Sequence, residues 1–400
     1  MFDESGLKKT IILVSTLLGV LLSANHSLAA TYYVDYETGN DNSAGLSQSA
    51  PWKRSPGMSG VTGTAAATSL QPGDTVYFKK GVVWPASALP LTIARNGTSG
   101  NPITFSVTNW GTSSHAIFDA EQTDNQAIYS YGYSYFTING IEARNPAADG
   151  VYYYAIRVGG GGAAGINLTN CNTLNGSIYL VTSGGSVLNC DVDYGNVQPN
   201  AEAPAIEVIW STGVTIRGNT IRNFNYAALK TGGDSSVRSQ NMIVEKNYIY
   251  SPGSPSTLQA GIILRDTITS VYRYNIIDLR TASGSPRGMT WWNSGGTNNI
   301  YNNTIVLNGS GTGIYASTQT GNVFRNNIVY TAATGFLLLS GSGDVDYCDI
   351  FSAGTAVGTG AWTWGTHNTT SDPQLVDVNS LPDGARLQSS SPAIDAAVVF

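Results

Sequence analysis

The chain has 400 residues, of which 46 are glycine. Only 12% of the residues are charged, about half the share found in an average soluble protein. Amphipathic helices carry Lys, Glu and Arg along one face, so this composition argues against a helical protein and favours strands and turns. The net charge is −6 and no basic block is present, which excludes nucleic acid as an expected partner.

The first 29 residues have the pattern of an export signal peptide. Two lysines at 8–9 precede an apolar run at residues 10–24, and Ser27 and Ala29 fit a small-x-small cleavage site. The run is short for a membrane span. We therefore expect cleavage near Ala30, secretion by a bacterial-type route and no membrane attachment afterwards. An uncleaved membrane anchor is the alternative.

One short motif recurs between about residues 126 and 355. Each copy has an apolar residue, two mostly polar residues, a fixed position, a variable residue and another apolar residue. An upstream segment has a small residue, an apolar one, a variable one and usually another apolar one, as in "AIEV" and "GIIL", and this period-2 alternation predicts a short strand a. Strands b and c flank the fixed position. Successive copies, 19 to 32 residues apart, place there Asn139, Cys171, Cys190, Asn219, Asn247, Asn275, Asn303, Asn327 and Cys348.

Three strands in a repeat of this length, with no helix, predict one coil of a parallel β-helix. Asparagine at the fixed position tolerates the left-handed backbone of a sharp bend between strands b and c, and its amide can hydrogen bond to its copies in neighbouring coils. We expect about eight to ten coils. Residues 30–125 would form the N-terminal cap and first strands, residues 126–355 the coils, and residues 356–400 a capping tail with Trp362 and Trp364 as cap aromatics.

Cysteines of exported proteins usually form disulfide bonds, but three cysteines are too few to stabilise a chain of this size in that way. Cys171 and Cys190 fall one coil apart in the repeat. We expect free thiols, and a bridge between these two remains open.

Four stretches outside the repeat are also informative: "TYYVDYETGNDNSAGLSQSAPWK" (31–53), "LQPGDTVYFKKGVVW" (70–84), "GTSGNPITF" (97–105) and "DPQLVDVNSLPDGARLQSSSPAID" (372–395). They resemble bacterial secreted right-handed parallel β-helix proteins, over nearly all of the chain after the signal. The resemblance implies an all-β, right-handed, single-stranded parallel β-helix. That family includes lyases acting on pectin or alginate, some glycoside hydrolases, uronate epimerases and surface proteins. In its lyases the substrate cleft follows the outer face of the first strand, which is strand a here.

Charge is scarce at the outward positions of strand a, so the neighbouring trio Glu207, Lys230 and Arg265 stands out. Aromatic side chains along the same face suit a sugar chain that carries carboxylates. The expected substrate-binding residues are Tyr179, Trp292 and Arg157.

β-Elimination on a uronate requires a neutralised carboxylate, a base for the C5 proton and a proton for the leaving oxygen. Glu207 would hold Ca²⁺, a hard cation that prefers oxygen ligands. Lys230 would be the base, and Arg265 a carboxylate clamp or acid. The sequence thus favours a polysaccharide lyase that acts, as a monomer, on an acidic polysaccharide.

Three other interpretations remain open. The trio can be a cross-strand charge network that aids solubility. The protein can be a glycan-binding or adhesion module without catalysis. It can also be a glycoside hydrolase or epimerase, and hydrolysis needs two carboxyl groups about 5–9.5 Å apart. The candidate carboxylates for hydrolysis are Asp191, Asp193, Glu202 and Asp266.

Overall fold

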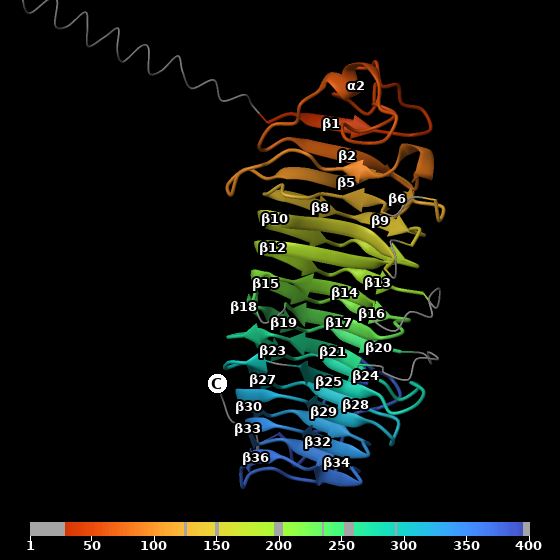
Figure 1. Cartoon of the computed structure of the whole chain (residues 1–400). Helices are drawn as coiled ribbons and strands as arrows, with labels where there is room; N and C mark the ends of the chain where they lie inside the picture. The colour runs from red at the N-terminus through yellow and green to blue at the C-terminus, as the bar shows by residue number, and fades with distance from the viewer. Residues whose placement is uncertain are drawn as a thin grey trace, which may run out of the picture.

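The computed structural model describes residues 29–123, 126–148, 152–195, 203–233, 236–251, 260–292 and 294–394. Its strands stack in parallel along one axis, from the N-terminal end to the C-terminal end (Figure 1). The chain is a parallel β-helix and nearly all β, as the repeat predicts. The right-handed coiling stays a prediction, and the expected signal peptide falls almost entirely on residues 1–28, outside the described residues. Within the described part, no helix is long and apolar enough to cross a bilayer.

Each coil contributes up to three strands, and equivalent strands pair from coil to coil to form faces a, b and c. Face a consists of β4 (Leu91–Thr92), β7 (Ile128–Tyr129), β10 (Tyr154–Thr169), β12 (Ser177–Leu188), β14 (Pro204–Ile209), β17 (Ala227–Gly232), β21 (Ala260–Arg265), β25 (Arg287–Trp292), β29 (Thr312–Ala316), β32 (Thr334–Leu338) and β35 (Thr355–Val357). Face b consists of the second halves of β10 and β12 together with β1 (Thr31–Val34), β2 (Thr75–Lys80), β5 (Ile103–Gly111), β8 (Phe136–Asn139), β15 (Thr212–Arg217), β19 (Ile243–Glu245), β23 (Val271–Arg273), β27 (Asn299–Tyr301), β30 (Gln319–Arg325), β33 (Gly341–Asp346) and β36 (Ala361–Trp364).

Face c is an 11-stranded sheet of its own, whereas β10 and β12 run through the corner and join faces a and b into one 25-stranded sheet. Three two-residue strands extend that sheet at the same corner: β18 (Ser239–Gln240), β22 (Thr267–Ile268) and β26 (Ser294–Gly295). Face c consists of β3 (Val83–Trp84), β6 (Ala116–Asp119), β9 (Ile141–Arg144), β11 (Asn172–Leu174), β13 (Asp191–Asp193), β16 (Thr220–Arg222), β20 (Tyr248–Tyr250), β24 (Ile276–Asp278), β28 (Thr304–Val306), β31 (Ile328–Tyr330) and β34 (Asp349–Phe351).

The core fills the inside of the coils with apolar side chains that repeat in register. On face a, the inward residues of eight consecutive coils are completely buried, which is what period-2 alternation requires of a strand with one buried side. They are Ile156, Ile178, Ile206, Leu229, Ile262, Met289, Ile314 and Phe336.

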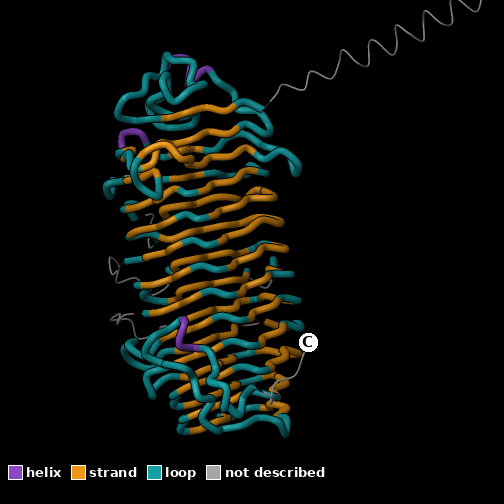
Figure 2. Tube along the Cα trace, turned by 180° about the vertical axis from the view of Figure 1, so that it is seen from behind, coloured by secondary structure: helices purple, strands orange, loops and turns teal. Residues whose placement is uncertain are grey.

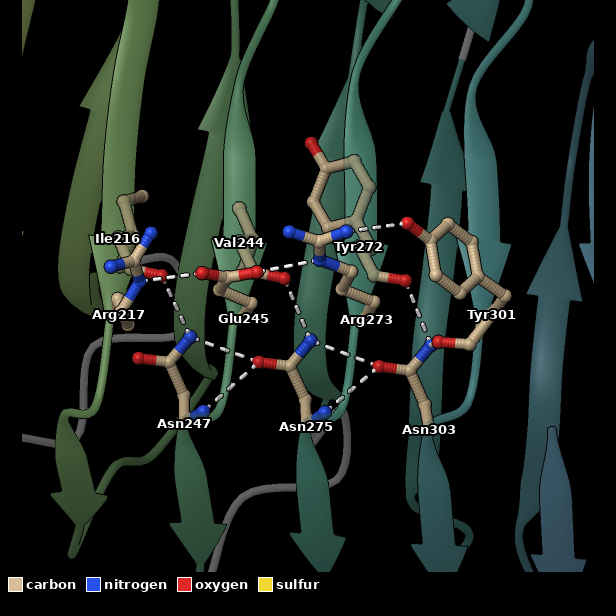
Figure 3. Close-up of polar contacts among 10 residues, drawn as sticks. All are labelled: Ile216, Arg217, Val244, Glu245, Asn247, Tyr272, Arg273, Asn275, Tyr301 and Asn303. Atoms are coloured by element: carbon tan, nitrogen blue, oxygen red, sulfur yellow. Dashed lines mark hydrogen bonds and ion pairs between the residues drawn. The ribbon is translucent and has the colours of Figure 1, made fainter. Parts of the chain in front are cut away.

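A column of buried asparagines follows the corner between faces b and c. The Nδ2 atom of Asn247 donates to Oδ1 of Asn275 at 2.9 Å, and Asn275 donates to Asn303 in the same way (Figure 3). Each Nδ2 also donates to a backbone carbonyl, and each Oδ1 also accepts from the backbone N–H of the preceding asparagine. The stack runs from Asn219 to Asn327, and the Sγ of Cys348 lies beyond Asn327.

The prediction was wrong for one member of this column and for the backbone role of the others. Thr169 pairs with Asn139 in register, so Ile141 of β9, rather than Asn139, occupies the level of Cys171. The left-handed backbone falls on the residue before the column, such as Gly218 (φ 68°) or Lys246 (φ 56°). The buried amide is needed for its hydrogen bonds, while its neighbour makes the bend.

The two ends of the stack differ. Helix α2 (Gly63–Ala67) and the loops around it lie over the N-terminal end (Figure 1). A second short helix, η1 (Ala86–Ala88), follows β3. At the other end Trp362 of β36 packs edge-on against Phe324 and Phe336. The chain then turns back, and the loop-rich segment with η2 (Asp383–Ala385) lies along the outside of the last coils (Figure 2).

All three cysteines are buried free thiols, in agreement with the expectation for Cys171 and Cys190.

Candidate functional site

The outward residues of face a form one continuous row, in the register that alternation predicts. Arg157 pairs with Tyr179, Tyr179 with Glu207, and Glu207 with Lys230. Strand spacing separates successive members by about 4.8 Å. Arg265 lies one coil beyond Lys230 and two residues further along its strand, because Gly232 is its partner. The fold therefore brings the predicted charged trio together on adjacent strands.

Glu207 is the centre of this cluster. Its side chain is only 3% exposed, although it points to the outer side of the strand. Lys230 Nζ donates to Oε1 at 2.6 Å, and the Tyr154 hydroxyl donates to Oε2 at 2.9 Å. A buried carboxylate requires such partners, since an unpaired one costs several kcal/mol. Both oxygens of Glu207 are thus engaged, one by Lys230 of the adjacent strand β17 and one by Tyr154 of β10, two coils away on the other side.

Tyrosines surround this carboxylate and remain protonated. Burial, reinforced by the negative charge of Glu207, raises the pKa of Tyr154 far above the ordinary range. The same two causes raise the pKa of Tyr179 to about 12. The Arg157 guanidinium lies 5.5 Å from the ring centre of Tyr154 and 5.7 Å from that of Tyr179, within the range of cation–π attraction. Proton donors and cations therefore dominate the surface around Glu207.

A cleft of about 500 Å³ opens over this cluster and spans five coils of face a. Its charged lining consists of three cations and one carboxylate. The lining residues are Tyr152, Tyr154, Arg157, Tyr179, Glu207, Ile209, Trp210, Lys230, Gly233 and Arg265. Five of the six side chains predicted for the site line this cleft.

The sixth, Trp292, lies next to Arg265 in register but outside the cleft lining, and its ring packs 6.3 Å from that of Tyr226. Tyr154 and Trp210 were missed by the sequence reasoning. A register irregularity between Tyr154 and Ile156 shifts Tyr154 out of the simple alternation. Trp210 follows the last residue of β14 in a turn, where alternation assigns no side.

The carboxylates considered for hydrolysis lie elsewhere. Asp191 and Asp193 share the outer side of β13 on face c, and Arg222 of the next coil forms ion pairs with both. Asp266 is 97% buried, and Glu202 lies outside the described residues. Of the described residues that line the cleft, Glu207 is the one carboxylate.

The donor set does not fit a calcium ion. Ca²⁺ takes six to eight oxygen ligands, and both oxygens of Glu207 already accept hydrogen bonds from Lys230 and Tyr154. In the part of the chain that the structure describes, no three His, Cys, Asp or Glu side chains are placed to hold a metal ion. Calcium binding by Glu207 stays a prediction, and no chemical step below depends on it.

No protein-family model and no curated protein sequence matches the chain. Among solved structures, it is similar to a GH136 lacto-N-biosidase from Eubacterium ramulus, with a TM-score of 0.53 and 14% identity over 86% of this chain and 67% of the other. It is also similar to a mannuronic-acid-specific family 6 polysaccharide lyase from human gut microbiota, with a TM-score of 0.48 and 14% identity over 76% and 74% of the two chains.

A pectate lyase, Pel9A, matches over 94% of this chain and 93% of its own, with a TM-score of 0.40 and 14% identity. The structural neighbours thus include a glycoside hydrolase, polysaccharide lyases, an epimerase and a surface adhesin. At such low identity the likeness shows the fold alone.

Proposed function

We propose that the protein is exported, binds an acidic, uronate-containing polysaccharide in the face a cleft, and cleaves it by β-elimination. The observation that supports this most is the charge of the cleft. Arg157, Lys230 and Arg265 face a single carboxylate there, on a chain whose net charge is −6. A local excess of positive charge on an acidic protein attracts anionic ligands and disfavours neutral ones that cannot satisfy the cations.

In the proposed reaction the guanidinium groups of Arg157 and Arg265 pair with uronate carboxylates, which makes the C5 proton more acidic. Arginine suits this role because its planar fork matches a carboxylate. Lys230 must be neutral to act as a base, so its ammonium proton passes to water before the reaction. Lys230 then takes the C5 proton, the bond from C4 to the glycosidic oxygen breaks, and a C4–C5 double bond forms. The leaving oxygen takes a proton from water.

A non-catalytic glycan-binding module is the second candidate. It is favoured by the fact that Glu207 already has two protein partners, Lys230 and Tyr154, so the cluster is satisfied without substrate. In that case the ion pair only holds the floor of the binding cleft. A glycoside hydrolase is less well supported, because hydrolysis requires two carboxyl groups across one cleft.

The variant Lys230→Arg separates the first two candidates. Arginine keeps the positive charge and can keep the ion pair with Glu207, but it is always protonated and cannot be the base. Pectate, alginate and mixed uronate polymers are incubated with the protein, and the ultraviolet absorbance of unsaturated uronate is followed. We expect turnover by the natural chain and a loss of at least about 100-fold in Lys230→Arg.

The matched control is Lys79→Arg. Lys79 makes a similar ion pair, at 2.8 Å, with buried Asp35 at the N-terminal end of the stack. The Lys79→Arg variant should leave turnover unchanged. An active Lys230→Arg variant would refute the assignment of the base. Binding of uronate polymers without turnover, unaffected by Lys230→Arg, would favour the binding module. New reducing ends without the absorbance would indicate a hydrolase.

A further inference from the structure

A second cleft, of about 380 Å³, adjoins the first and shares Arg157, Tyr179 and Trp210 with it. It extends toward the N-terminal end of the stack, over β7 and β10. Its lining differs sharply from that of the first cleft, because Arg157 is the one charged side chain among the described residues that form it. Apart from Ser130, the remaining walls are aromatic, aliphatic or glycine. The lining residues are Tyr129, Ser130, Tyr131, Arg157, Val158, Gly159, Gly160, Gly161, Gly162, Tyr179, Val181, Trp210 and Val237.

Two of the aromatic side chains are unusually exposed. Tyr131 is 64% exposed and Trp210 is 44% exposed. Trp210 also has a left-handed backbone (φ 50°), a conformation that costs a bulky residue roughly 1–2 kcal/mol. Two large aromatic side chains held open to solvent, one of them at a cost in backbone energy, point to a binding role.

The glycine run removes side chains from the wall beside Tyr131. Gly159 pairs with Val181 and Ala164 with Ser183, so the residues between form a bulge that β12 does not match. A Cβ atom on Gly160 would lie 2.8 Å from the ring of Tyr131, whereas one on Gly162 would meet no atom within 4 Å. The bulge therefore places bare backbone beside an aromatic ring and leaves room above it.

Such a surface suits the apolar face of a neutral sugar ring. The face of an aromatic ring is negative, so it attracts polarised C–H groups and repels a carboxylate. The guanidinium that a carboxylate would seek, Arg157, already lies over the rings of Tyr154 and Tyr179 on the side of the first cleft.

We infer that the second cleft is a subsite for a neutral sugar, so that the preferred polymer alternates uronate and neutral residues rather than being a homopolymer of uronate. The inference rests on the proposed function, because the first cleft supplies the uronate contact. The shared residues Arg157, Tyr179 and Trp210 make the two clefts continuous, so one chain can occupy both.

Isothermal titration calorimetry tests this with three oligosaccharides of equal length: an alternating uronate–neutral one, an all-uronate one and a neutral one. We expect the alternating ligand to bind about tenfold more tightly than the all-uronate ligand. In Tyr131→Ala the alternating ligand should lose about tenfold in affinity, equivalent to about 1.4 kcal/mol, and the all-uronate ligand should change less than twofold. Tyr131→Phe should restore binding. Tyr274→Ala is the control, because Tyr274 is 47% exposed and does not line either cleft.

Arg265→Ala distinguishes failure of the proposed function from failure of the subsite. It should weaken both acidic ligands, and more so at low salt, since salt screens charge attraction. If the neutral ligand binds alone, depends on Tyr131 and is unaffected by Arg265→Ala, the subsite stands and the proposed acidic substrate fails. Tighter binding of the all-uronate ligand, equal losses for both acidic ligands in Tyr131→Ala, or no binding of any ligand would overturn the inference.

Discussion

Replacing one asparagine in the middle of the buried stack should destabilise the whole protein. In Asn275→Ala the amide no longer accepts from the backbone N–H and from Nδ2 of Asn247, at 3.2 and 2.9 Å. It also no longer donates to the Val244 carbonyl and to Asn303, at 3.0 and 2.9 Å. Each such bond contributes about 1 kcal/mol net, and buried groups left unpaired cost more. We therefore expect a loss of about 4 kcal/mol, a large part of the 5–15 kcal/mol typical of folded proteins.

Urea unfolding followed by fluorescence and circular dichroism measures this loss as a lower midpoint at unchanged slope. The control is Asn299→Ala, because Asn299 is exposed at the first position of β27. A decrease below about 1 kcal/mol in Asn275→Ala would refute the view that the stack holds the corner through satisfied amides. Different midpoints from the two probes would show that the coils unfold in separate steps, as nearest-neighbour repeats can.

Two further outcomes can be measured. Burial, helped by Asp372, raises the pKa of Asp349 from 3.8 to about 7, so the folded state binds the proton more tightly than the unfolded state. Stability should therefore fall as the pH rises from about 4 through 7, by up to ~4 kcal/mol. In Asp349→Asn this fall should disappear from the pH profile of the urea midpoint, and an unchanged profile would contradict the assignment. Burial also raises the pKa of the Cys348 thiol to about 12. A thiol reagent should label no cysteine in the native protein and three per chain in denaturant, whereas a single labelled cysteine would reveal a bridge between Cys171 and Cys190.

The sequence predicted the stacking of face a residue by residue. Glu207 and Lys230 were placed on adjacent coils because alternation, the small residue that opens each strand and the periodic fixed position all agree. The small residue has a physical cause: a Cβ atom on Gly288 would lie 2.4 Å from a methyl group of Ile305, on the facing strand of face c. Because this steric limit recurs in each coil, the small residue recurs at the start of each face a strand and can be recognised from one sequence.

Features that break the period could not be predicted in the same way. Asn139 lies two residues before the column, at the level of Thr169, and Gly140 (φ 70°) makes the bend there. The position of Tyr154 beside Glu207 was not predicted, because it depends on a register irregularity of the backbone that the alternation of residues does not show. Trp210 lies in a turn, and nothing in its neighbours assigns it to the cleft.

The corners of the coil differ in how much variation they tolerate. Two residues, such as Gly218 and Asn219, connect faces b and c in every coil from β10 to β34. The connection from face c to face a ranges from two residues, between Leu174 and Ser177, to ten, between Asp193 and Pro204. One inserted residue at the corner between faces b and c would turn over the side chains of the face c strand that follows it. An insertion at the corner between faces c and a leaves the scaffold intact and changes only the rim of the clefts. New ligand preferences can therefore evolve, or be engineered, by exchanging these connections one at a time while the rod beneath them is kept.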